Sequence, residues 1–246
     1  MTDSKEKCVD LQNKVVIITG ASGGIGEAVA KELDAAGMSL VLTGRSQDKL
    51  ERLASKLKNA KVFPGEITNP ELPQKLVDFA IQTFGQLDVV FNNAGVMTVG
   101  PIESVDIEEI CQMVRVNVES AYRIAYTALR HFKQSGSGFL INTSSIAGLK
   151  TAPQLAAYCG TKSAIEAFTD SLRVELAGTD IRVSSIAPGT VDTGLYEKWG
   201  EEQKDFIYSG GVLQSADIAR CVRFILEQPG NVLIPRLLVV PAAEPV

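Results

Sequence analysis

Short apolar runs alternate with longer amphipathic stretches along almost the whole chain. The apolar runs predict buried strands at residues 14–19, 39–43, 61–64, 87–91, 138–142, 181–186 and 237–240. Apolar residues at steps of three and four predict helices at residues 24–36, 47–58, 70–84, 106–132 and 156–176. Apolar strands separated by helices of this length favour crossover connections and a parallel sheet covered on both faces. With no linker or internal repeat, we predict one doubly wound α/β domain of about seven strands over residues 1–246.

The predicted helices at 106–132 and 156–176 carry apolar residues on more than one side. Val116 and Ile124 lie away from the main apolar stripe of the first helix, and Ala164 lies away from that of the second. Helices of this kind are usually covered on more than one side. The pattern predicts a homodimer or homotetramer, although an insertion packed over both helices would produce the same pattern.

Composition and charge exclude several other functions. The formal net charge is −5 and no run of Lys and Arg provides a basic stripe, which argues against a nucleic-acid partner. No apolar stretch approaches the roughly 18 residues that span a bilayer, so we expect no membrane partner. The polar first residues, MTDSKEKCVDLQNK, resemble neither a signal peptide nor an anchor.

Cysteine and histidine usage narrows the chemistry. Four cysteines without CxxC spacing favour a reduced, cytoplasmic protein with no metal site. Because His131 is the single histidine, a Ser-His-Asp triad and a histidine-rich metal centre are both disfavoured. Any acid–base catalysis must then come from Tyr, Lys, Cys or carboxylate side chains. Cys159 is a poor candidate for a nucleophile, since no histidine is available to activate it.

A glycine-rich turn, TGASGGIG, follows the first predicted strand and leads into the first predicted helix. Glycines in this context let the backbone approach a pyrophosphate, whose charge then lies at the helix N-terminus. The spacing GxxxGxG differs from the commoner GxGxxG, and no Gly-Lys-Ser/Thr follows as in a Walker motif. The turn predicts a dinucleotide-binding Rossmann fold, with cofactor contacts from Gly20, Ser22, Gly23, Gly24, Ile25 and Gly26.

The end of the second predicted strand bears on the choice between the two nicotinamide cofactors. An acidic residue there would bind a free ribose 2′-hydroxyl, whereas an arginine accommodates a 2′-phosphate. Gly44 occupies the position of the acid and Arg45 follows it. We therefore expect NADP(H) rather than NAD(H), with a further hydroxyl contact from Ser22.

Tyr158 and Lys162 are four residues apart, so on a helix they lie on one face about a turn from each other. A neighbouring ammonium stabilises a phenolate and is expected to lower the tyrosine pKa toward the range that suits general acid–base catalysis. YxxxK alone is weak evidence. Here it follows the glycine turn, the sequence NNAG at residues 92–95, and Ser145 thirteen positions before the tyrosine, and it precedes PGTVDT at residues 188–193.

Together these features resemble the short-chain dehydrogenase/reductase family, in its compact single-domain branch, from residue 14 to about residue 240. The resemblance implies that Tyr158 is the general acid in reduction and the base in oxidation. It implies that Lys162 binds the nicotinamide ribose and lowers the tyrosine pKa, and that Ser145 orients the substrate oxygen. Asn117 matches the family asparagine that holds a water in a proton relay to the lysine.

The resemblance also implies further cofactor contacts. Glu66, where the family usually has Asp or Asn, and Ile67 would lie beside adenine. The remaining contacts would come from Asn93, Ala94, Gly95, Pro188, Gly189, Val191 and Thr193.

The substrate is less well defined. Residues 193–212 match the variable segment that covers the substrate, and Leu195, Tyr196, Trp199, Phe206 and Tyr208 give it an apolar, aromatic character. This favours NADPH-dependent reduction of a ketone or aldehyde. An alternative is NADP-dependent oxidation of a 3-hydroxy acid or serine-like substrate, because the C-terminal region is similar to bacterial serine, 3-hydroxy acid and clavulanate-type dehydrogenases. A non-catalytic dinucleotide sensor and an epimerase or dehydratase of the longer branch remain open.

Overall fold

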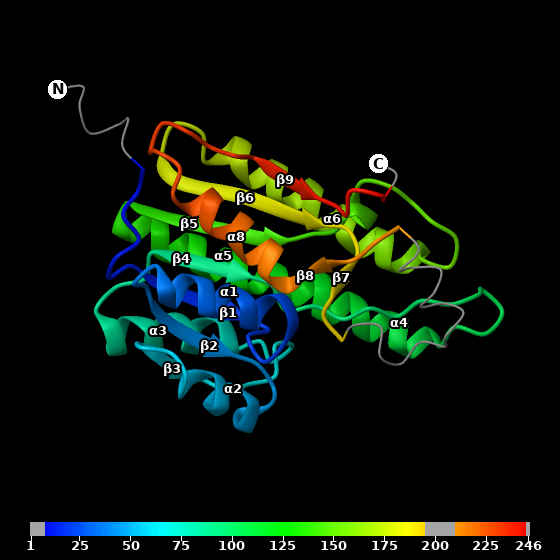
Figure 1. The fold of residues 1–246 in the computed structure, drawn as a ribbon, viewed down its shortest axis with the longest axis horizontal. Helices are drawn as coiled ribbons and strands as arrows, with labels where there is room; N and C mark the ends of the chain where they lie inside the picture. Colours follow the sequence, from blue (N-terminus) through cyan, green and yellow to red (C-terminus); the bar gives the residue numbers. More distant parts are fainter. Residues whose placement is uncertain (1–7, 195–209, 245–246) are drawn as a thin grey trace.

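Seven parallel strands form the central sheet of the computed structural model, which describes residues 8–194 and 210–244 (Figure 1). Their spatial order is β3-β2-β1-β4-β5-β6-β9. The strands are β1 Val15–Thr19, β2 Ser39–Thr43, β3 Ala60–Val62, β4 Val89–Asn92, β5 Ser137–Thr143, β6 Asp180–Pro188 and β9 Arg236–Val239. The order reverses between β1 and β4, and open α/β sheets bind their ligands outside the carboxyl ends of the strands at such a point.

Helices cover both faces of this sheet, in three layers (Figure 1). One core lies between the sheet and α1 Gly24–Ala35, α2 Gln47–Ala54 and α8 Ser215–Leu226. The opposite core lies between the sheet and α3 Leu72–Phe84, α5 Ser120–Ser135 and α6 Ala156–Glu175. The remaining described elements are α4 Ile107–Val114, a π turn at Arg115–Glu119, a 3₁₀ turn at Ile146–Gly148, and the short paired strands β7 Val191–Asp192 and β8 Leu213–Gln214.

Strand β1 is buried on both of its faces, and its run of apolar residues fits this position. Val16 and Ile18 point into the core under α1, whereas Val15 and Ile17 point into the core under α3. Side chains that alternate between two covered faces must all be apolar. In the sheet β1 lies between β2 and β4, with both of which it pairs in parallel.

All seven predicted strands are present, and the parallel, doubly wound fold is confirmed. The predicted helix at 106–132 is instead divided by the π turn, where the Ser120 amide bonds the Arg115 carbonyl five residues earlier. No proline or glycine marks this position in the sequence, so periodicity alone did not reveal it. Helix α8 was also missed, although Ile218, Val222 and Ile225 have helical spacing.

Candidate active site

A cavity of about 610 Å³ opens at the carboxyl ends of β1, β4, β5 and β6. Segments far apart in the sequence meet in its wall: the glycine turn after β1, the loop after β4, the first turns of α6, and the loop after β6. The predicted residues in this wall are Gly20, Gly23, Gly24, Ile25, Asn93, Ala94, Gly95, Ser145, Tyr158, Lys162, Pro188, Gly189, Val191 and Thr193.

The glycine turn fits a phosphate because side chains are excluded from it. Gly20 and Gly24 have φ of +66° and +52°, which L side chains rarely adopt. A Cβ on Gly26 would lie 2.2 Å from the Gly20 carbonyl oxygen. Helix α1 begins after Gly23 with no side-chain cap, so its first N–H groups offer an anion-binding N-terminus. These features fit the pyrophosphate of a dinucleotide.

Gly26→Ala is expected to destabilise the protein by about 1–3 kcal/mol, since the new Cβ would force the turn and helix α1 apart. Gly23→Ala is the matched control, because nothing lies within 4 Å of its Cβ position and its φ of 177° is extended backbone. Thermal unfolding of both variants measures the difference. An equal loss of stability in the two would contradict the close approach described here.

Thr19, the last residue of β1, positions the loop after β4. Its hydroxyl oxygen accepts the Asn93 amide at 2.8 Å and the Ala94 amide at 2.9 Å. The Asn93 side chain donates back to the Thr19 carbonyl and accepts a hydrogen bond from the Thr143 hydroxyl on β5. The strand ends β1, β4 and β5 are thereby tied together beneath the cavity.

Asn117 lies within the π turn and is buried. Its carboxamide pairs with the backbone of Val96, accepting from the amide and donating to the carbonyl, both at 2.8 Å. It also donates to the Thr161 hydroxyl on α6 at 3.3 Å. The side chain therefore joins the β4 loop to the helix that carries Tyr158. The water that the sequence predicts at Asn117 stays a prediction.

Tyr158, Lys162 and Ser145 come together on one side of the cavity, and all three are at least nine-tenths buried. Lys162 Nζ donates to the Thr143 carbonyl at 3.0 Å and lies 5.8 Å from the Tyr158 ring centroid. Ser145 hydrogen-bonds the Tyr158 side chain. The neighbouring Ser144 instead donates to the Lys162 backbone carbonyl, which supports the choice of Ser145.

The pKa values differ from the sequence-based prediction. Burial raises the pKa of Tyr158 to about 12, and the Ser145 hydrogen bond lowers it only in part. Burial also lowers the pKa of Lys162 to about 8, and the Glu166 carboxylate opposes that lowering. Tyr158 is therefore a phenol that holds its proton, as a general acid must.

Five predicted cofactor residues lie outside the cavity wall: Ser22, Gly26, Arg45, Glu66 and Ile67. A Cβ on Gly44 would lie 3.0 Å from Ser22 Oγ, so an acidic side chain at 44 would have to displace Ser22. Arg45 and Glu66 are exposed, whereas Ile67 packs into the core under α3. Gly26 lies behind the wall, packed against the turn.

Some residues near the site were not predicted. Glu244, in the C-terminal turn, lines the cavity and accepts the Thr190 amide at 3.2 Å. No sequence pattern connects it to residues 54 positions away. Thr143 was missed because its contact with Lys162 uses a backbone atom. Leu195, Tyr196, Trp199, Phe206 and Tyr208 lie outside the described residues.

Within residues 8–194 and 210–244, no group of three or more His, Cys, Asp or Glu side chains is placed to hold a metal ion. Among the helices of the same ranges, none has the length and apolar character needed to cross a membrane.

Comparison with known proteins agrees with this geometry. A family model described as short chain dehydrogenase matches residues 14–204. An uncharacterized oxidoreductase of Staphylococcus aureus (strain USA300) is 37% identical over 233 residues, 94% of this chain and 98% of that protein. The structure of 3-ketoacyl-(acyl-carrier-protein) reductase from Brucella melitensis complexed with NADH superposes with a TM-score of 0.87 and 30% identity, covering 95% of this chain and 99% of that one. The closed form of serine dehydrogenase complexed with NADP⁺ has a TM-score of 0.88 and 26% identity, covering 94% and 96%.

Proposed function

The chain belongs to the short-chain dehydrogenase family of oxidoreductases, and on that premise we propose that it reduces a ketone or aldehyde to an alcohol with NADPH. The observation that carries the proposal is the cavity, which places the buried Tyr158, Ser145 and Lys162 together in a wall that also contains the glycine turn. When bound, the cofactor supplies a hydride to the carbonyl carbon. The residues of the chain supply the proton and the orientation.

Tyr158 donates its phenol proton to the carbonyl oxygen of the substrate. Its pKa of about 12 keeps the proton in place at neutral pH until the oxygen becomes basic. Ser145, held by the Pro188 carbonyl at 3.4 Å and by the Ala147 amide at 3.1 Å, orients the same oxygen. Lys162 stabilises the phenolate that remains, because its ammonium lies on the same helical face.

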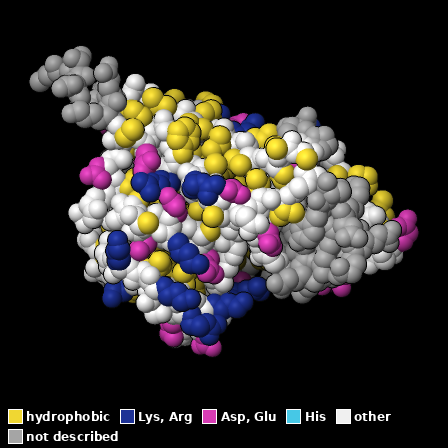
Figure 2. All heavy atoms as spheres, viewed as in Figure 1, with side chains coloured by type: hydrophobic (Ala, Val, Ile, Leu, Met, Phe, Trp, Pro, Cys, Tyr) yellow, Lys and Arg dark blue, Asp and Glu magenta, His cyan; other side chains and the backbone are white. Residues whose placement is uncertain are grey.

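Gly44, Arg45 and Ser22 support the preference for NADPH. Gly44 stands where an acidic side chain would repel a phosphate, and Arg45 is exposed just before α2. Figure 2 shows Lys and Arg side chains gathered on the part of this face where Figure 1 places α2. A 2′-phosphate would meet a positive surface there.

Arg45→Gln is expected to lower kcat/KM for NADPH by about 10–100-fold and to change that for NADH little, because a charge-assisted hydrogen bond to phosphate is lost. Lys49→Gln on α2 is the control, since it removes the same charge from the same exposed surface. Steady-state kinetics with both cofactors measure the ratio. A wild-type protein with the higher kcat/KM for NADH would contradict the assignment.

A 3-hydroxy acid or serine-like substrate is the second candidate. It is favoured by the serine dehydrogenase among the superposed structures and by Lys150, which lines the cavity and carries a cation for a carboxylate. A panel of ketones, aldehydes and hydroxy acids, assayed in both directions with NADPH and NADP⁺, distinguishes carbonyl reduction from hydroxy-acid oxidation. Turnover of neutral carbonyl compounds supports the first proposal, and turnover confined to hydroxy acids overturns it in favour of the second.

A further inference from the structure

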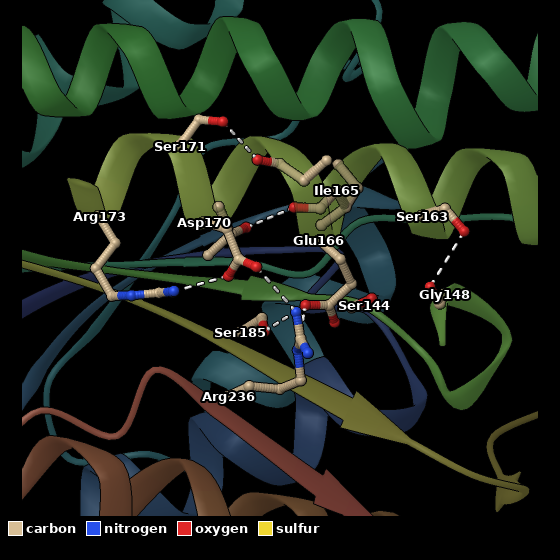
Figure 3. A network of polar contacts seen from close by, with 12 residues as sticks. Ser144, Gly148, Ser163, Ile165, Glu166, Asp170, Ser171, Arg173, Ser185 and Arg236 are labelled. Carbon is tan, nitrogen blue, oxygen red and sulfur yellow. Dashed lines mark hydrogen bonds and ion pairs between the residues drawn. The ribbon is translucent and has the colours of Figure 1, made fainter. Parts of the chain in front are cut away.

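A buried carboxylate lies one helical turn beyond Lys162. Glu166 is the residue four positions later on α6, and it is 4% exposed. Figure 3 shows its side chain pointing from α6 toward the sheet, where it meets Arg236 of β9 and Ser185 of β6. Arg236 Nε donates to Glu166 Oε2 at 2.6 Å, and the Ser185 hydroxyl donates to the same oxygen at 3.0 Å. Two strands, β6 and β9, therefore hold this one oxygen of the helix α6 side chain.

The second carboxylate oxygen of Glu166 is different. Oε1 is buried and has no hydrogen-bond partner within residues 8–194 and 210–244. A buried, unsatisfied carboxylate oxygen is costly, since nothing replaces the water that it has lost. A carboxylate buried at such a cost is a candidate for a functional role, because an apolar residue of similar size would pack there without the penalty.

Arg236 alone does not explain the need for Glu166. Its guanidinium also contacts Asp170 Oδ2 at 3.2 Å, and Asp170 in turn contacts Arg173 at 2.9 Å. The half-exposed Asp170 would thus serve as a partner for Arg236 at the rim without any buried acid. The distinguishing property of Glu166 is its position next to Lys162.

The charged surroundings of Lys162 point to the same residue. Among the residues that the structure describes, Glu166 is the one charged group that acts on the pKa of Lys162, and it raises that pKa against the lowering by burial. The Arg115 and Glu119 side chains of the π turn, which packs on α6, are exposed to solvent. The other titratable groups on α6 near Lys162 or in the cavity wall are Tyr158, Cys159, Lys150 and Glu244.

We propose that Glu166 is a positioning residue for the catalytic lysine: its fixed, buried carboxylate keeps Lys162 in the ammonium form that phenolate stabilisation requires. Arg236 and Ser185 hold the carboxylate in place through their hydrogen bonds to Oε2. The effect of Glu166 on catalysis rests on the function proposed above. Its effect on the charge of Lys162 is independent of that function, because it is a property of the cofactor-free protein.

Glu166→Gln is expected to lower the pKa of Lys162 by about one unit or more, since the favourable charge is lost and burial remains. The pKa is measured in the cofactor-free protein by NMR titration of ¹³C,¹⁵N-labelled lysine, with the Lys162 signal assigned by its absence in Lys162→Met. Asp170→Asn is the matched control. It removes one acid from the same helix and from the same arginine, and it should leave the Lys162 pKa unchanged.

An unchanged Lys162 pKa in Glu166→Gln, or an equal fall in Asp170→Asn, would overturn the proposal. If Glu166→Gln does not fold, Glu166→Asp is used for the same measurement. The shorter side chain moves the charge away from Lys162, so a smaller fall in the Lys162 pKa is expected. An unchanged Lys162 pKa in this variant would also overturn the proposal. Both results hold whether or not the enzyme reduces carbonyl compounds.

The second readout is the pH profile of kcat/KM for NADPH, which reports groups of the free enzyme. Its alkaline limb should move to lower pH in Glu166→Gln by the same amount as the NMR pKa, with little change in rate well below the limb. An identical loss of rate at every pH would indicate a merely structural role and contradict the proposal.

Discussion

Tyr158→Phe is expected to lower turnover by about 10²–10⁴-fold, the usual contribution of a general acid. The substitution removes only the phenol oxygen, so the ring keeps its place beside Lys162 and Cys159 in the cavity wall. The carbonyl oxygen then loses the proton that it must receive as the hydride arrives. Cofactor affinity should change little, and fluorescence titration with NADPH measures it separately from turnover.

The control for this variant is Tyr126→Phe. Tyr126 lies on α5, is about half exposed and packs edge-on against Phe168, away from the cavity. Its phenol oxygen has no role in the proposed reaction, so turnover should remain close to that of the wild type. Near-normal turnover in Tyr158→Phe would remove Tyr158 from the mechanism.

Lys162→Met is expected to reduce both cofactor affinity and the rate of the bound complex. The ammonium is lost from the position where the ribose is expected, and the Tyr158 phenolate loses its stabilising charge. A fall in turnover of about 10²-fold or more under saturating NADPH would show the second effect apart from the first. Lys162→Arg keeps the charge but not the compact ammonium, so it should recover cofactor affinity more than rate.

The pH dependence of the wild type follows from the same lysine. Because the folded pKa of Lys162 is lowered to about 8, the ammonium is present below that pH and is lost as the pH rises through it. Reduction should therefore slow above about pH 8 through Lys162. Tyr158, with a pKa of about 12, would keep its proton over the same range. An alkaline limb that persists unchanged in Lys162→Met would contradict this origin.

The sequence predicted the sheet well because most of its strands contain a short apolar run, as expected of strands that are covered on both faces. The run from Val15 to Thr19 is an example: its neighbours β2 and β4 are parallel to it, as predicted. The glycine turn was also predictable, since only glycine accepts the backbone of Gly20 and Gly24. These features depend on local sequence or on a short pattern.

Features that depend on tertiary contacts were not predictable. The π turn at Asn117 leaves the apolar pattern almost unchanged, so a continuous helix was the natural interpretation. The pairing of Glu166 with Arg236 joins residues 70 positions apart, and Glu244 reaches Thr190 across 54 positions. The pKa of Tyr158 was predicted in the wrong direction because a YxxxK pattern shows the nearby charge but not the depth of burial.

Transfer of deuterium from deuterated NADPH tests the central claim most directly. The cofactor carries the label at the transferable position of the nicotinamide, and the product is examined by mass spectrometry and NMR after incubation with an accepted ketone or aldehyde. The account predicts one deuterium on the new carbinol carbon for each NADPH oxidised, with the rate strongly reduced in Tyr158→Phe. Label that stays with the cofactor, or product formed without net oxidation of NADPH, would contradict it and would favour a sensor or an epimerase.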